Sequence, residues 1–160
     1  MLKDLGLQEK EDMGSPAIRV ERDGKWYFEG AEIIRKDILS LFYDSLHLDE
    51  DGYYIEINGE RERLEVEDTV FLVQGAELVK DGEEAFAIRL NDGTEERLDL
   101  NTFRIAERNV PYCLVKEGRF PARFLRLPFY QVAQHAQHAE DADEYFILLN
   151  GRKYPLQGAS

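Results

Sequence analysis

The sequence contains a single cysteine, Cys113, so no disulfide bond can form within the chain of 160 residues. A lone thiol is more typical of a reducing compartment than of secreted proteins. Long apolar runs are missing too: no stretch approaches the roughly 18 residues that a membrane-spanning helix needs. The amino terminus has no apolar signal-peptide core. These absences predict a cytoplasmic protein that does not enter a membrane.

Motifs of common catalytic sites are also missing. Neither the G-x-G-x-x-G nor the G-x-x-x-x-G-K-[ST] phosphate-binding loop occurs, and no G-x-S-x-G motif marks a serine hydrolase. Cys113 lies in a strand-like pattern, where a thiol most often packs as a small apolar side chain. The sequence therefore favours a non-enzymatic protein without a cofactor, and it leaves an undescribed reaction open as the alternative.

Positive charge is scarce, because 20 basic residues face 33 acidic ones and give a formal net charge of −13. The deficit lies in residues 1–100, whose net charge is −15, whereas residues 101–160 have a net charge of +2. Overall acidity argues against broad binding to a nucleic-acid backbone. Within residues 104–126, however, six basic side chains accompany only two acidic ones, which makes this stretch locally basic.

Apolar periodicity and turn signals predict an α+β fold built mostly on antiparallel sheet. Alternating apolar and polar residues flank Gly-containing turns, as in β-hairpins. Helical spacing of apolar residues covers residues 35–48 and 128–139. We expect four segments: a mobile leader (1–16), a small amino-terminal α+β lobe (17–62), a β-rich lobe with one helix (63–156) and a tail (157–160).

The two ends of the chain resemble each other, each reading as hairpin, helix, strand and hairpin turn. The matching blocks are Asp23-Gly24-Lys25-Trp26 with Glu117-Gly118-Arg119-Phe120, Ile33-Ile34-Arg35 with Phe124-Leu125-Arg126, and Tyr53–Gly59 with Tyr145–Gly151. The offset between the copies drifts only between 91 and 94 residues. We interpret this pattern as an internal duplication, with chance likeness between hairpins as the alternative.

An ordered set of blocks over residues 17–156 is similar to a bacterial, mainly proteobacterial, family known as domain-of-unknown-function family 1285. The blocks are Arg22–Tyr27, Leu41-Phe42, Asp51–Tyr54, Val66–Phe71, Asn91–Gly93, Tyr112–Lys116 and Phe120–Phe124. The resemblance implies repeated motifs in two lobes and a pleckstrin-homology-like outline for the second lobe. It also implies a ligand site between the lobes and a signalling role, and it identifies no catalytic residue.

The basic stretch is the main candidate for a binding site. Arg119, Arg123 and Arg126 would supply positive charge, and Tyr112 or Trp26 a stacking surface. Arginine is suited to planar, bidentate recognition of phosphate or carboxylate. We therefore expect a small anionic ligand, of which a nucleotide is one example. The alternative is that these arginines pair with the acidic lobe and join the two halves.

Two further groups of residues suggest other functions. The acidic residues Glu65, Glu67 and Asp68 form a strand face that could dock a basic protein partner, or that is simply solvated. His135 and His138 are three residues apart on the predicted second helix, so they share a face and could hold a metal ion in a hydrolase. A solvent-exposed helix face, with alanines packing behind it, is the simpler interpretation of these histidines. The sequence does not reveal the oligomeric state.

Overall fold

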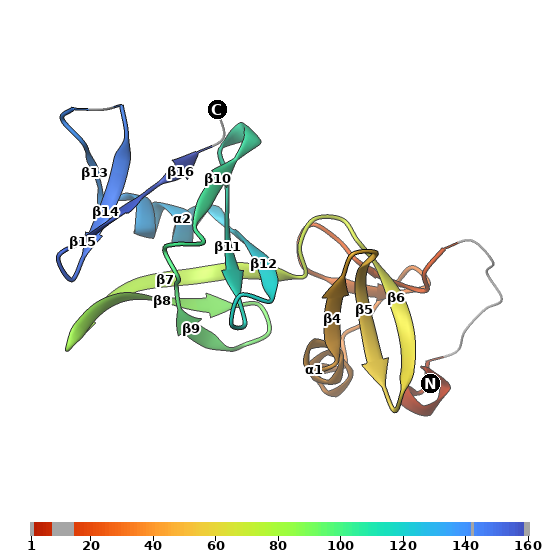
Figure 1. Ribbon diagram of the computed structural model, residues 1–160. Helices are drawn as coiled ribbons and strands as arrows, with labels where there is room; N and C mark the ends of the chain where they lie inside the picture. The colour runs from red at the N-terminus through yellow and green to blue at the C-terminus, as the bar shows by residue number, and fades with distance from the viewer. Residues whose placement is uncertain (1, 8–14, 142, 159–160) are drawn as a thin grey trace. The chain divides into compact units, whose positions relative to one another are not determined.

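The computed structural model describes residues 2–7, 15–141 and 143–158. The chain divides into an amino-terminal unit, Met1–Val70, and a carboxy-terminal unit, Phe71–Ser160. Figure 1 shows the elements of both units, which are described separately below. In the described part of the chain, neither α-helix has the length and apolar character needed to cross a membrane.

The amino-terminal unit is a six-stranded sheet with one α-helix and a short 3-10 turn. Its sheet has the order β3-β2-β1-β6-β5-β4, in which β1 and β6 are parallel and the other pairs antiparallel. The elements are η1 (Leu2–Leu5), β1 (Ile18–Val20), β2 (Trp26–Phe28), β3 (Ala31–Glu32), α1 (Lys36–Asp44), β4 (Leu46–Asp49), β5 (Gly52–Ile57) and β6 (Glu60–Val66). Strand β6 continues past the predicted lobe boundary at residue 62.

The core of this unit forms where alternating strand residues meet one face of α1. Ile38 and Phe42 are the buried residues of α1, and the Trp26 ring packs against Phe42 with 5.6 Å between ring centroids. The predicted helix over 35–48 is too long, because residues 46–49 form β4 beside β5. Leucines at positions 46 and 48 fit both a helical and an alternating pattern, and pairing with β5 selects the strand.

Part of the predicted mobile leader is folded. Leu2–Leu5 forms the turn η1, and the Leu2 side chain is completely buried, so this apolar residue anchors the start of the chain. Residues 8–14 of the leader lie outside the described residues. Residues 157–158 of the predicted tail form β16, which pairs with β10, while residues 159–160 lie outside the described residues.

The carboxy-terminal unit contains a seven-stranded sheet, a separate three-stranded sheet and one α-helix. The larger sheet has the order β16-β10-β11-β12-β7-β8-β9, and the smaller one β13-β14-β15. The elements are β7 (Phe71–Asp81), β8 (Glu83–Leu90), β9 (Glu95–Arg97), β10 (Arg104–Ala106), η2 (Glu107–Asn109), β11 (Val110–Val115), β12 (Phe120–Phe124), α2 (Arg126–Ala133), β13 (Ala136–His138), β14 (Tyr145–Leu149), β15 (Arg152–Pro155) and β16 (Gln157–Gly158).

Helix α2 packs against β7 over an aromatic core. The side-chain Oε1 of Gln131 accepts a hydrogen bond from the Ala76 amide of β7 at 3.2 Å, and the rings of Phe103 and Phe124 meet edge to face. The predicted helix over 128–139 is wrong at its end, since residues 136–138 form β13. Pairing of this short segment with β14 accounts for the difference.

A partly buried ion pair joins two hairpin turns of the carboxy-terminal unit. Lys116 Nζ lies 2.7 Å from Asp92 Oδ2 and donates to Thr94 Oγ1 at 2.9 Å. The Asp92 side chain is only 7% exposed and the Lys116 side chain 21%. Burial alone would raise the pKa of the Asp92 carboxyl, but hydrogen bonds from Lys116 and Thr94 outweigh it and hold the pKa below its ordinary value.

The duplication is visible in the order of the elements, and the α+β prediction is confirmed. The first copy runs β1-β2-β3-α1-β4-β5-β6 and the second β11-β12-α2-β13-β14-β15, without a counterpart of the two-residue strand β3. The tight turns of the two copies match closely: Asn58 and Asn150 have φ values of 53° and 54°, and each precedes a glycine with positive φ. The copies differ in pairing, because β6 joins β1 whereas β15 stays in its own three-stranded sheet.

Candidate functional site

Three side chains of the basic stretch lie in a row across neighbouring strands of the carboxy-terminal unit. Tyr112 on β11 stands directly opposite Arg104 on β10 and opposite Arg123 on β12. Directly paired residues point to the same face of a sheet, so the three side chains share one face. The Arg104 guanidinium lies over the Tyr112 ring, 4.8 Å from its centroid. We call this set the arginine–tyrosine row.

The opposite face of these strands belongs to the core. Phe120, Ala122 and Phe124 of β12 are buried, as is Cys113 of β11. Arg123 alternates with these buried residues along β12, so its side chain points away from the core face. Burial, reinforced by nearby carboxylates, raises the pKa of the Cys113 thiol to about 12, which fits its predicted role as a small apolar side chain.

The other predicted arginines lie outside the row. Arg119 is in the β11–β12 turn, where its Nε donates to the Lys116 carbonyl at 3.0 Å and its guanidinium lies near the Phe120 ring. Arg126 is exposed at the start of α2. Sequence reasoning missed Arg104 as a site residue, although it belongs to the same basic stretch. Only the strand register, which single-sequence patterns do not give, reveals that it meets Tyr112.

Trp26 cannot provide the stacking surface that the sequence suggests. Its side chain is 1% exposed in the amino-terminal unit. The ring packs against Phe42 and, edge to face, against Tyr43 at a centroid distance of 5.3 Å. Its strand alternates buried and partly exposed positions, so a tryptophan on the inward parity belongs to the core.

The arginines of the two units differ in their surroundings. Every arginine of the amino-terminal unit lies 2.7 to 3.7 Å from a carboxylate: Arg19, Arg22, Arg35, Arg61 and Arg63. Among the described residues of the carboxy-terminal unit, no carboxylate of the same unit lies that close to Arg104, Arg108, Arg119 or Arg126. These four guanidinium groups are therefore not paired with a described carboxylate of their own unit.

The acidic residues that suggested a protein-binding face are close to arginines of their own unit. Glu65 lies 3.2 Å from Arg19, and Glu67 Oε2 accepts a hydrogen bond from the Arg22 amide at 2.8 Å. The Arg22 guanidinium lies 3.7 Å from Asp68. Part of the negative charge of this face is therefore compensated locally, and binding of a basic partner here stays a prediction.

The two histidines do not share a helix, so the spacing argument for a metal pair is wrong. His135 follows the end of α2 and packs edge to face against Phe86 at 5.4 Å. His138 lies on β13, with Nε2 3.4 Å from Asp143 Oδ1. Within residues 2–7, 15–141 and 143–158, no group of three or more His, Cys, Asp or Glu side chains could hold a metal ion.

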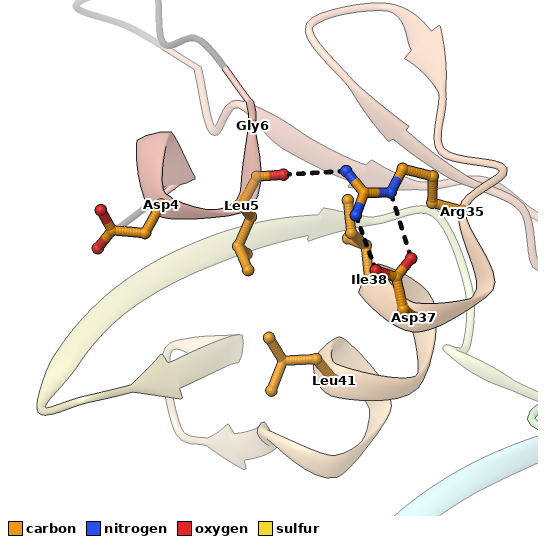
Figure 2. A pocket seen from close by; sticks show the side chains of 7 residues that line it. All are labelled: Asp4, Leu5, Gly6, Arg35, Asp37, Ile38 and Leu41. Atoms are coloured by element: carbon orange, nitrogen blue, oxygen red, sulfur yellow. Dashed lines mark hydrogen bonds and ion pairs between the residues drawn. The ribbon is translucent and has the colours of Figure 1, made fainter.

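A surface hollow lies between η1 and α1 in the amino-terminal unit, with a volume of about 390 Å³. Figure 2 shows the residues that line it, which are Asp4, Leu5, Gly6, Arg35, Asp37, Ile38 and Leu41. Arg35 holds Asp37 through two hydrogen bonds of 3.2 and 2.7 Å, and its Nη1 reaches the Leu5 carbonyl at 3.5 Å. The Arg35 hydrogen bond lowers the pKa of the Asp37 carboxyl.

Comparison with known proteins supports the family resemblance. Residues 8–69 match the family model "Domain of unknown function (DUF1285), N-terminal domain". A crystal structure of a DUF1285 family protein from Silicibacter pomeroyi DSS-3 is 24% identical, with a TM-score of 0.74, over 95% of this chain and 85% of that chain. One from Shewanella baltica OS155 is 20% identical, with a TM-score of 0.63, over 74% and 91%. The two structures show the fold, and no curated protein matches the sequence.

Proposed function

We propose that this chain, whose resemblance to domain-of-unknown-function family 1285 is confirmed through residues 8–69, is a non-enzymatic binding protein. Its carboxy-terminal unit would recognise a small anion at the arginine–tyrosine row. One observation carries this proposal: Arg104, Tyr112 and Arg123 stand directly opposite one another on three adjacent strands. Rigid strands hold such a group of side chains more firmly than a loop would.

Charge supports the proposal. Arg104 is exposed, and no carboxylate of its unit lies within 4.0 Å among the described residues. The Tyr112 ring beneath it restricts the guanidinium, so less side-chain freedom is lost when an anion binds. Guanidinium groups bind phosphate and carboxylate through paired hydrogen bonds. A phosphate or carboxylate ligand is therefore the class that fits, and a nucleotide could add stacking on the exposed guanidinium plane.

A regulatory or signalling role fits this proposal better than catalysis. The row combines two cations with one phenol and contains no carboxylate or imidazole that could act as a general base. The seven-stranded sheet, with α2 packed on β7, supports a pleckstrin-homology-like outline for the carboxy-terminal unit. It remains a proposal together with the signalling role.

The test is a ligand screen by thermal shift with inorganic phosphate, nucleotides, sugar phosphates and dicarboxylates, followed by titration calorimetry. A ligand at 100 times its Kd stabilises a protein by about 2.7 kcal/mol, which is roughly 5–10 °C for a chain of this size. Arg104→Ala should weaken binding about ten- to hundredfold, since it removes charge-assisted hydrogen bonds.

Arg152→Ala is the matched control. Arg152 is also exposed, and its guanidinium lies 5.0 Å from the Tyr154 ring, but it belongs to β15 and not to the row. The control should bind the ligand as tightly as the unaltered protein. Absence of any stabilising anion would refute the proposal, as would equal losses for Arg104→Ala and Arg152→Ala, because that result indicates general charge attraction.

A further inference from the structure

The hollow between η1 and α1 is a second candidate binding site, separate from the arginine–tyrosine row. We propose that it docks a basic amphipathic segment of a partner protein, which inserts an apolar side chain against Leu5, Ile38 and Leu41. The hollow lies in the amino-terminal unit and shares no residue with the row.

The apolar part of the hollow is built from both of its walls. Figure 2 shows Leu5 of η1 and Leu41 of α1 pointing toward one another across the opening. Ile38, one turn earlier on α1, is 3% exposed and joins the hollow to the core. The fully buried Leu2 anchors η1, so the second wall is part of the folded unit. The hollow thus has an apolar lining that comes from two folded elements, η1 and α1.

The volume of about 390 Å³ is sufficient for an inserted side chain and its neighbours. An amphipathic helix binds a groove through apolar residues spaced three or four apart. The hollow is bounded by two short helical elements and is open to solvent, not enclosed. This shape suits an inserted side chain of a segment better than an enclosed small molecule, which usually has most of its surface buried.

The rim selects for positive charge on the partner. Among the described residues that line the hollow, two carboxylates, Asp4 and Asp37, accompany one cation, Arg35. Asp37 and the Leu5 carbonyl already engage the Arg35 guanidinium, yet the Asp37 side chain stays 68% exposed. The unit as a whole carries 9 basic and 19 acidic residues, a net charge of −10. Complementary charge steers association and disfavours acidic partners.

The probe is a synthetic 14-residue peptide of leucine and lysine, with the leucines on one helical face, and fluorescence anisotropy measures its binding to the full chain. A second peptide carries glutamate in place of every lysine. The lysine peptide should bind, less tightly as salt increases, and the glutamate peptide should not. Backbone amide NMR shifts should concentrate at Leu5, Asp37, Ile38 and Leu41.

Leu41→Lys should weaken binding of the lysine peptide about ten- to hundredfold, because it fills the hollow with a charged side chain. Asp37→Asn should weaken it less and reduce the salt dependence. Leu48→Lys is the matched control: Leu48 is 39% exposed on β4 of the same unit and does not line the hollow. Circular dichroism verifies that each variant is folded.

Three results would overturn the proposal. The first is that about 1 mM lysine peptide causes no amide shifts at the hollow. The second is that the glutamate peptide binds as tightly as the lysine peptide. The third is that Leu41→Lys and Leu48→Lys weaken binding of the lysine peptide equally. If Leu41→Lys does not fold, Asp37→Asn and the NMR shifts decide the question. Arg104→Ala should leave peptide binding unchanged, so failure of one binding site is distinguishable from failure of the other.

Discussion

Asn58 and Asn150 occupy equivalent tight turns in the two copies of the repeated motif, but only Asn150 docks onto a neighbouring strand. Its Oδ1 accepts a hydrogen bond from the Glu84 amide at 2.7 Å, and its Nδ2 donates to the Glu84 carbonyl at 2.9 Å. Asn58 makes no side-chain hydrogen bond within the described residues. Replacing each asparagine by glycine therefore separates the conformational role of the residue from its docking role.

Glycine is suited to both turns because φ is 53° at Asn58 and 54° at Asn150. Each substitution gives a Gly-Gly turn, so its effect on the unfolded chain is the same in both variants. Asn150→Gly also removes two hydrogen bonds, each contributing about 0.5–1.5 kcal/mol. The partly exposed position favours the lower half of that range. We expect Asn150→Gly to cost about 1–2 kcal/mol more than Asn58→Gly.

Urea unfolding followed by far-UV circular dichroism measures both free energies of unfolding. Hydrogen exchange of the Glu84 amide gives a local reading, because this amide loses its Oδ1 acceptor in Asn150→Gly and not in Asn58→Gly. Equal costs for the two variants, with unchanged exchange at Glu84, would refute the argument that the β14–β15 turn is fastened to β8 by this side chain.

Three other predictions concern charge and burial. Lys116→Met should lower the free energy of unfolding by about 2–4 kcal/mol, because it leaves the Asp92 carboxylate, which is 7% exposed, without its cation. Asp92→Asn should lower it less. Urea unfolding measures both variants and the double variant, and a cost of the double variant equal to the sum of the two single costs would contradict the coupling. Hydrogen bonds from Arg63 lower the pKa of the Asp49 carboxyl from its ordinary value of 3.8 to about 2. The contribution of this ion pair to the stability of the folded protein is therefore present above pH 4 and is lost as the pH falls toward 2. Arg63→Gln should raise that pKa toward 3.8 in a carboxyl NMR titration, and an unchanged value would oppose the assignment. The Cys113 thiol should resist alkylation at pH 8 until the chain unfolds, whereas rapid labelling of the folded protein would show that it is accessible.

Local signals predicted the turns and the class of fold well. Glycines with positive φ stand at the predicted turns, among them Gly24, Gly93, Gly118 and Gly151. The helix ends were less predictable, because Leu46 and Leu48 match both helical and alternating spacing. Whether such a segment becomes a helix or a strand depends on the strand with which it can pair, and that strand is a separate part of the sequence.

The candidate sites depended on information that the sequence does not carry locally. The basic stretch offered Arg123 and Tyr112 as separate candidates, but the register that places Tyr112 opposite both Arg123 and Arg104 depends on the pairing of three strands. The hollow was not predictable, since it needs η1, within a segment whose polar composition predicts a mobile leader. The buried side chain of Leu2 shows that the turn Leu2–Leu5 within this segment is folded.

The strand pairings also set an order in which the units can assemble during synthesis. Every strand of the amino-terminal sheet lies within residues 18–66, so this unit has all its strand partners once Val70 has emerged. The carboxy-terminal sheet must wait, because β10 pairs with β16 at Gln157 and Gly158. During that interval the outer edge of β10 is uncovered. An uncovered edge invites pairing with other chains, so the pairing of β16 with β10 protects this edge once residues 157–158 have been synthesised.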